Sequence, residues 1–173
     1  LTLREGEEQY RLVGAAVAWP SDWTPAEKLG LPLRALHAPI QGYEEQLATG
    51  VDNFMAKLKP GAIYGRCNWF IAATPDMRWV AEPPERAFAH VTAENAGSTL
   101  FVRSERQTLR RLPQTGAILF TIGIYVCSLG ALSPGNIDRL ANAMRTLLDG
   151  EGERRGAGAY AGALIRYAGH TKE

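Results

Sequence analysis

The sequence predicts an α+β fold in which helices pack on an antiparallel sheet. Apolar runs rich in Ile, Val, Phe and Tyr mark strands, and two amphipathic stretches mark helices. These segments are mixed without the strict strand–helix alternation that a parallel sheet requires. A helical layer on such a sheet can enclose a ligand pocket.

The first forty residues predict one strand and short helices. Residues 10–19 form an apolar run closed by Pro20, which is typical of a strand. Thr24 stands as an N-cap before a proline, so a brief helix is expected to reach Leu29. Residues 31–40 contain two prolines, and any helix between them is short; this segment carries His37.

The middle of the chain predicts a long helix, a strand and a loop. Residues 43–58 place their apolar side chains on one helical face and end at a Pro-Gly pair. Residues 64–73 alternate as a strand does, with Cys67 and Trp69 on one face. Residues 74–98 are rich in Pro, Glu and Ala and predict a long irregular loop.

The segment from 100 to 113 predicts a short strand followed by a capped helix. Ser104 and Gln107 have the spacing of a capping box, and Pro113 would end the helix. Glu105 and Arg106 then lie in the first turn, beside an apolar wall. They are either a functional carboxylate–guanidinium pair or part of a solvated surface face.

The last third predicts a buried strand and two helices. Residues 117–127 are apolar enough for a buried strand, and Ser133 with the following proline opens an amphipathic helix that Gly150 closes. Residues 160–168 form a weaker helix. Residues 1–150 are therefore expected to be a single domain, and residues 151–173 a flexible linker with a weak C-terminal helix.

Composition excludes several classes of function. The chain has 173 residues, and its 19 Lys and Arg nearly balance its 18 Asp and Glu. A nearly neutral chain has no overall positive electrostatic potential that would attract nucleic acid or an anionic membrane. No apolar run reaches the roughly 20 residues that span a bilayer. Two cysteines, Cys67 and Cys127, cannot form a zinc site alone and are expected to be buried free thiols. We expect a soluble, cytoplasmic protein.

Several segments, in the same order along most of the chain, resemble the haem-dependent oxidative N-demethylase family. They are residues 19–23 (WPSDW) with 27–30 (EKLG), 36–43 (LHAPIQGY), 66–69 (RCNW), 92–97 (TAENAG) and 105–113 (ERQTLRRLP). The resemblance implies a PAS-like fold enclosing a haem b pocket. It implies hydroxylation by O2 of the N-methyl group of a small secondary amine, followed by release of formaldehyde, with electrons from a separate flavin and iron–sulfur reductase.

The resemblance favours His37 as the iron ligand, because imidazole is a common axial donor of haem. Taken without the resemblance, a lone histidine is more often structural. A thiolate from Cys67 or Cys127 is the alternative ligand. His90 and His170 are expected to face solvent.

Other residues fit the remaining needs of a haem oxygenase. Guanidinium groups bind carboxylates in a bidentate fork, so the propionates would be held by Arg66, Arg103 and Arg106. Glu105 and Arg106 are the candidate catalytic residues, with Glu105 relaying protons or holding an ammonium charge. Trp69 and Tyr125, together with Tyr43, would line the site, although ordinary core packing explains an aromatic residue equally well.

Two other functions are compatible with these observations. A haem-binding PAS-type sensor would bind the cofactor without turnover. A haem-free relative would keep the fold alone, and Gly123 supports it, because the family resemblance implies an arginine at this position.

Overall fold

The computed structural model describes residues 2–5, 9–20, 23–40, 42–78, 80, 82–147, 152–153 and 155–170. They divide into two compact units, Leu1–Asn68 with Glu105–Gly123 and Trp69–Ser104 with Ile124–Glu173. Helices and antiparallel strands are mixed, which confirms the α+β class. The boundary predicted at residue 150 stays a prediction, because the residues around it lie outside the described part of the chain.

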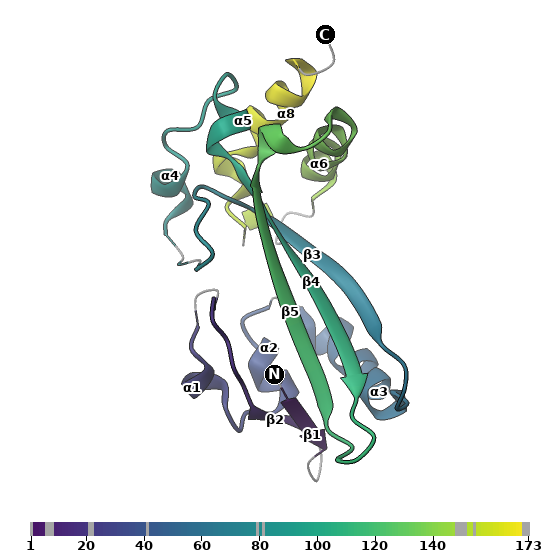
Figure 1. The fold of residues 1–173 in the computed structure, drawn as a ribbon. Coiled ribbons are helices and arrows are strands. Elements are labelled where there is room, and N and C mark those ends of the chain that lie inside the picture. The colour runs from purple at the N-terminus through teal and green to yellow at the C-terminus, as the bar shows by residue number, and fades with distance from the viewer. Residues whose placement is uncertain are drawn as a thin grey trace. The chain divides into compact units, whose positions relative to one another are not determined.

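The first unit begins with two strands and a series of short helices (Figure 1). In order these are β1 (Thr2–Glu5), β2 (Tyr10–Gly14), α1 (Pro25–Lys28), α2 (Leu33–His37), the π-helix η1 (Glu44–Ala48) and α3 (Thr49–Lys57). The predicted cap of α1 is confirmed, because the Thr24 amide donates to Glu27 Oε2 at 3.1 Å. The predicted helix over residues 43–58 is confirmed as the continuous pair η1 and α3.

Three longer strands, β3 (Tyr64–Ala72), β4 (Phe101–Arg111) and β5 (Ile118–Ser128), have residues in both units. The sheet order is β2-β1-β5-β4-β3, and β1 is antiparallel to both β2 and β5. The first unit closes its core between this sheet and its helices. The buried core residues there are Tyr10, Leu12, Leu33, Met55, Leu58 and Ile118.

The helix predicted after Ser104 is wrong, because these residues belong to β4. Gln107 is buried while its neighbour Arg106 is exposed, which is the alternation of a strand rather than the face of a helix. The backbone instead pairs within the sheet and turns into β5, where the amide of Leu112 donates to the carbonyl of Ala117 at 2.8 Å. Sheet pairing therefore outweighed a local capping signal.

The strand predicted over residues 117–127 is confirmed as β5, but it is not buried throughout. Ile118 is fully buried, whereas Ile122 and Tyr125 are exposed. Burial in β5 does not alternate with a period of two, since Ile118 and Ile122 share a strand face; the strand is covered at its start and exposed in its middle.

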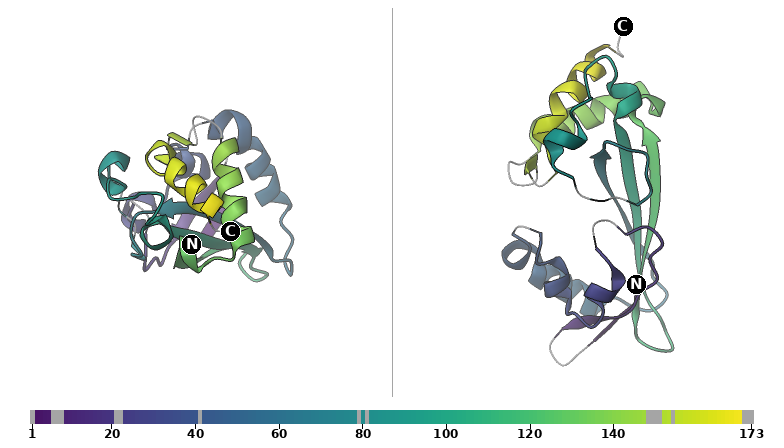
Figure 2. Two further views of the ribbon diagram at one scale, coloured as in Figure 1. Left: turned by 90° about the horizontal axis from the view of Figure 1, so that it is seen from above. Right: turned by 90° about the vertical axis from the view of Figure 1, so that its left-hand side faces the viewer.

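The second unit packs helices around the ends of the strands assigned to it. Its helices are α4 (Pro84–Ala87), α5 (Ala96–Thr99), η2 (Leu129–Ala131), α6 (Pro134–Thr146), η3 (Ala157–Ala159) and α8 (Ala161–His170). α6 and α8 contact each other and lie side by side in both views of Figure 2. The predicted start of α6 is confirmed at Ser133, its N-cap; Gly150, its predicted end, lies outside the described residues.

The core of the second unit is aliphatic with an aromatic pair. Phe88 and Tyr160 pack with ring centroids 4.6 Å apart. Around them lie Ile71, Leu100, Val102, Leu129, Ile137, Met144 and Leu164. Among the described residues, no helix is both long and apolar enough to cross a membrane.

Candidate functional site

His37 is the last residue of α2, a helix fixed at both ends by the local sequence. Pro32 is its N-cap, and Leu33, the first helical residue, is buried in the core of the first unit. Pro39 follows directly after the C-cap. The imidazole is thereby presented toward the start of the long helix, where it stacks on Tyr43.

The tautomer of His37 follows from its hydrogen bond. Nδ1 lies 2.8 Å from the carbonyl oxygen of Leu33. A carbonyl only accepts, so Nδ1 carries the proton and Nε2 carries the lone pair. Burial lowers the pKa of His37; the hydrogen bond to the Leu33 carbonyl partly offsets this, and the charges of Arg66 and Lys28 lower the pKa further. The neutral imidazole with a basic Nε2 is the form that binds a metal.

A hydrogen-bonded chain of three side chains runs across β3 and β4 in the first unit. Arg66 Nε donates to Gln107 Oε1 at 2.8 Å, and Gln107 Nε2 donates to Glu105 Oε2 at 3.1 Å. The buried amide of Gln107 therefore fixes the positions of Arg66 and Glu105 relative to each other. Both ends of the chain are predicted site residues.

Gln107 is not among the predicted site residues, because its spacing from Ser104 indicates a helix cap. Glu105 and Gln107 are two residues apart in a strand and so share a face. Reading the segment with a period of two would have placed these polar side chains together. The role of the Leu33 carbonyl has no signal in the sequence, since it depends on the tertiary position of the imidazole.

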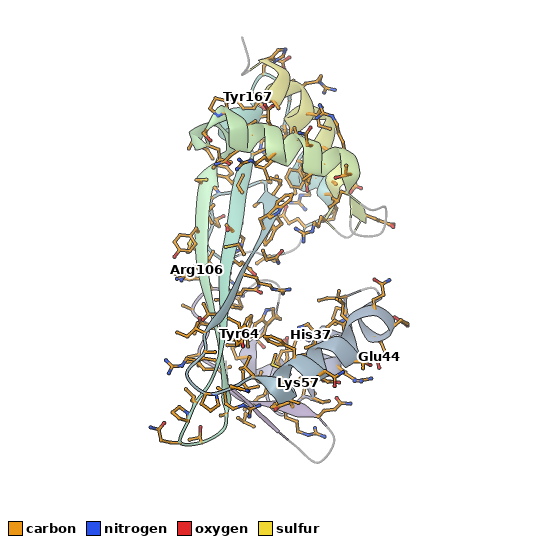
Figure 3. All side chains as sticks on the ribbon, turned by 90° about the vertical axis from the view of Figure 1, so that its right-hand side faces the viewer. His37, Glu44, Lys57, Tyr64, Arg106 and Tyr167 are labelled. Atoms are coloured by element: carbon orange, nitrogen blue, oxygen red, sulfur yellow. The ribbon has the colours of Figure 1, made fainter. Side chains whose placement is uncertain are left out.

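Glu105 and Arg106 do not form the pair that a helical turn would have made. As successive residues of β4 they point to opposite faces. Glu105 is half-buried beside Gln107, whereas Arg106, labelled on β4 in Figure 3, is exposed. Within the part of the chain that the structure describes, Arg106 makes no hydrogen bond or ion pair. Its guanidinium group is therefore available to a ligand.

The other predicted site residues lie in the second unit. Arg103 is only 1% exposed, donates from Nη1 to the carbonyl of Met77 at 2.5 Å, and lies over the ring of Phe70. Trp69 is half-buried under the guanidinium group of Arg155, which also donates to the Trp69 carbonyl. Tyr125 is 60% exposed on β5. Arg103 thus joins a loop to the sheet, whatever further role it has.

The cysteines differ from expectation. Both are free thiols, but Cys67 is exposed on β3 and only Cys127 is half-buried. The prediction that both are buried is wrong for Cys67, because the first four residues of β3, 64–67, are exposed on both faces of the strand. Among the described residues, no cluster of three His, Cys, Asp or Glu side chains is placed to hold a metal ion.

The segment TAENAG at 92–97 folds into a compact turn with a structural role. The Thr92 amide donates to Asn95 Oδ1 at 2.7 Å, and the Asn95 amide donates back to Thr92 Oγ1 at 3.3 Å. Gly97 has no room for a side chain because the hydroxyl of Tyr167 from α8 lies against it. His90 and His170 are exposed, as predicted.

The comparison with known families agrees with the resemblance seen in sequence. Residues 1–165 match the family described as haem-dependent oxidative N-demethylase, alpha subunit-like. The match spans nearly the whole chain and includes every site residue discussed above.

Proposed function

The chain belongs to the family of haem-dependent oxidative N-demethylases, alpha subunit-like, and we propose that it is a monooxygenase that demethylates a small secondary N-methylated amine. The family description supports haem dependence and oxidative N-demethylase-like activity.

The observation that carries the proposal is the state of His37. Its Nδ1–H is held by the Leu33 carbonyl at 2.8 Å, and burial lowers the pKa of the ring, which favours its neutral form. Nε2 would therefore supply the lone pair that binds the iron of haem b. A single histidine would be enough to hold haem, because the porphyrin brings the remaining nitrogen ligands of the iron with it.

Arg66 and Arg106 fit the propionates of that haem. Both are exposed guanidinium groups, and Arg66 uses only Nε in its bond to Gln107, so its Nη groups make no hydrogen bond within the described chain. A guanidinium edge binds a carboxylate through two parallel hydrogen bonds. Arg103, already bound to the Met77 carbonyl, remains a proposed third partner.

The protein would control the position of the amine and the supply of protons. Haem, when bound, would supply the oxygen chemistry. One oxygen atom of O2 enters the N-methyl C–H bond, and the other leaves as water with two electrons and two protons. The resulting carbinolamine then splits into formaldehyde and the demethylated amine. In this proposal Glu105, whose carboxylate accepts a hydrogen bond from Gln107, relays protons, and Arg106 is the second candidate catalytic residue. Tyr125, exposed on β5, offers an aromatic face to an ammonium ion, whereas the ring of Trp69 already lies under the guanidinium group of Arg155.

The two electrons require a partner. The family description names an alpha subunit, which fits an enzyme that works with another subunit. We propose a flavin and iron–sulfur reductase as the donor, because such a protein splits hydride equivalents into the single electrons that haem accepts.

The proposal is tested by turnover of the hemin-loaded full chain with an NAD(P)H-driven flavin and iron–sulfur reductase. Dimethylamine and other secondary N-methylamines are supplied in turn, and O2 consumption and formaldehyde are measured together. We expect amine-dependent O2 uptake with formaldehyde released in equal amount. If the chain binds haem but releases no formaldehyde when an amine is added, the proposed enzyme activity is contradicted and the alternative of a haem-binding sensor is favoured.

A further inference from the structure

Gln107 separates two opposite charges in the first unit. It is only 7% exposed, and its amide lies between the Arg66 guanidinium group on β3 and the Glu105 carboxylate on β4. Glu105 and Gln107 are two residues apart in the strand, so their side chains share the face that Arg66 reaches. Arg66 and Glu105 are therefore diagonal neighbours on two strands, and long side chains in such positions can meet directly.

The amide of Gln107 has one possible orientation. A guanidinium group only donates hydrogen bonds, and a carboxylate only accepts them. Oε1 must therefore face Arg66, at 2.8 Å from its Nε, and Nε2 must face Glu105, at 3.1 Å from its Oε2. The buried amide thus holds a cation with one end and an anion with the other, and is itself neutral.

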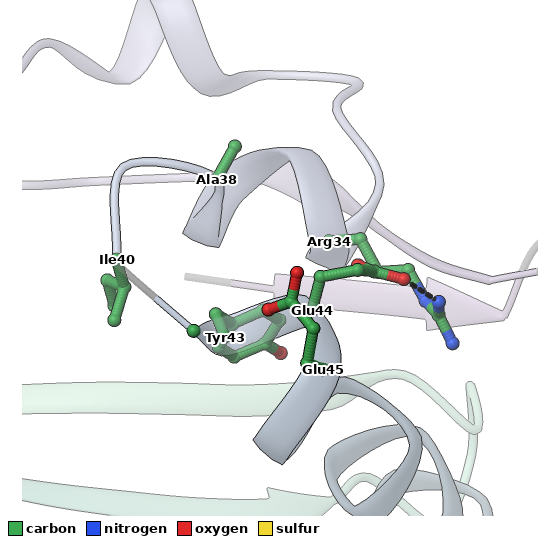
Figure 4. A pocket seen from close by; sticks show the side chains of 7 residues that line it. Arg34, Ala38, Ile40, Tyr43, Glu44 and Glu45 are labelled. Carbon is green, nitrogen blue, oxygen red and sulfur yellow. Dashed lines mark hydrogen bonds and ion pairs between the residues drawn. The ribbon is translucent and has the colours of Figure 1, made fainter.

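Arg34 shows the opposite arrangement in the same unit. In the wall of a small pocket at the start of η1, its guanidinium group donates directly to the Glu44 carboxylate (Figure 4). It also donates to Asp52 Oδ2, at 3.2 Å from Nε and 3.0 Å from Nη2. Two carboxylates neutralise this cation, so an anionic ligand would have to compete with both of them.

Arg66 keeps its positive charge close to His37. Its bond to Gln107 uses Nε, and its Nη groups make no hydrogen bond in the described part of the chain. Burial is the main cause that lowers the pKa of His37, and the charge of Arg66 adds to it, so the two groups lie near each other. A guanidinium edge in this position can bind a carboxylate through two parallel hydrogen bonds.

We propose that Gln107 is a positioning residue that keeps Arg66 and Glu105 from forming an ion pair, and so leaves Arg66 able to bind a haem propionate. Without the amide, the guanidinium group turns to the Glu105 carboxylate and is neutralised as Arg34 is. Gln107 contacts neither the iron nor the propionate; it acts through Arg66. The inference rests on the proposed function, because it concerns the anion-binding group of the same haem site.

The test is a titration of the full, cofactor-free chain with hemin and with hemin dimethyl ester, in which both propionates are blocked. Gln107→Met keeps the length of the side chain but makes neither hydrogen bond. We expect it to bind hemin about tenfold more weakly, the loss of one charge-assisted hydrogen bond. The dimethyl ester should bind both proteins alike, since it has no carboxylate for Arg66. Gln46→Met, the same change at an exposed residue of η1, should leave both affinities unchanged.

Two double variants show whether Gln107 acts through its neighbours. Glu105→Gln added to Gln107→Met removes the carboxylate that pairs with Arg66 and should restore most of the lost affinity for hemin. Gln107→Met added to Arg66→Met should cause no further loss, because its effect passes through Arg66. If Gln107→Met does not fold, Gln107→Glu keeps the size but gives Arg66 a charged partner, and it should weaken the binding of hemin but not of the ester.

Equal weakening of hemin and ester, unchanged affinity for hemin, or a loss that adds to that of Arg66→Met would overturn this role of Gln107. Normal hemin affinity and turnover in Gln107→Met would keep the enzyme and reject the positioning role. A wild type that takes up no hemin would reject the haem enzyme and the propionate with it. The separation of the two charges is then decided in the cofactor-free chain, where the NMR signals of the Arg66 Nη groups should differ between Gln107→Met and its double variant with Glu105→Gln; identical signals would refute it.

Discussion

The imidazole of His37 stacks on the ring of Tyr43, with centroids 4.5 Å apart and planes inclined by 10°. The stack and the hydrogen bond to the Leu33 carbonyl fix the ring on two sides. A fixed ring holds Nε2 in one direction, which lowers the conformational cost of binding iron. The same contacts hold His37 for the proposed iron binding and contribute to the stability of the fold.

The first prediction concerns pH. Burial lowers the pKa of His37 in the folded protein, so the unfolded chain binds this proton more readily. The free energy of unfolding of the cofactor-free protein should therefore fall as pH drops below about 6.5, the unfolded value. The fall should level off below the folded pKa. Urea unfolding across this range measures it.

His37→Gln should flatten this dependence, whereas His90→Gln, at an exposed histidine, should leave it intact. Equal slopes in the two variants would show that another group is responsible.

The second prediction concerns Arg111, which ties β4 to β2 and α3. Its guanidinium group donates to the carbonyls of Leu58, Gly116 and Met55 and to the hydroxyl of Tyr10, at 2.7, 2.8, 2.7 and 2.8 Å. Arg111→Lys cannot reproduce this fork and should lower the free energy of unfolding by about 2–4 kcal/mol. Arg110→Lys, at the exposed neighbour, should change it by less than about 0.5 kcal/mol. Equal losses for both variants in urea unfolding would argue against this role.

The third prediction concerns Gly97 in α5. A Cβ atom there would overlap the ring and hydroxyl of Tyr167, which also lies close to Gly130. Gly97→Ala should destabilise the protein by about 1–3 kcal/mol through overpacking. Gly50→Ala in α3, where a Cβ meets nothing within 4 Å, should stabilise it by about 0.5–1 kcal/mol. Thermal unfolding distinguishes the opposite signs, and the same sign for both would refute the packing argument.

The fourth prediction concerns Glu105. Glu105→Gln preserves size but removes the carboxylate that Gln107 holds. The variant should take up hemin as the wild type does and lose turnover by about a hundredfold or more, the range of general acid–base catalysis. Glu82→Gln is the matched control and should keep wild-type rates. Undiminished formaldehyde release in Glu105→Gln would show that the carboxylate has no part in proton transfer.

Elements with a strong local signal were predictable from sequence. α1 and α6 begin at an N-cap followed by proline, and both were found where that pattern placed them. The long helix over residues 43–58 was likewise found, although its first turn is a π-helix, which the apolar pattern does not reveal. The signals that define such elements lie within a few residues of one another in the sequence.

The middle of β4 was not predictable in this way. Its capping-box spacing at Ser104 is a local signal, whereas its conformation is fixed by pairing in the sheet. Predicting a helix at this point also hid the role of Gln107, whose side chain bonds to both Arg66 and Glu105. Arg66 and Gln107 are 41 residues apart in sequence. Contacts over such distances in sequence depend on the tertiary fold, and a single sequence does not show them.

The most direct test of haem binding at His37 is the absorption spectrum after hemin is added to the wild type, to His37→Ala and to His90→Ala. The wild type and His90→Ala should take up hemin stoichiometrically, with a sharp Soret band that shifts on dithionite reduction and again on binding carbon monoxide. His37→Ala should lose that band. An identical spectrum and occupancy in His37→Ala would contradict the assignment, and a reduced carbon monoxide band at the thiolate position would transfer the ligand to Cys67 or Cys127.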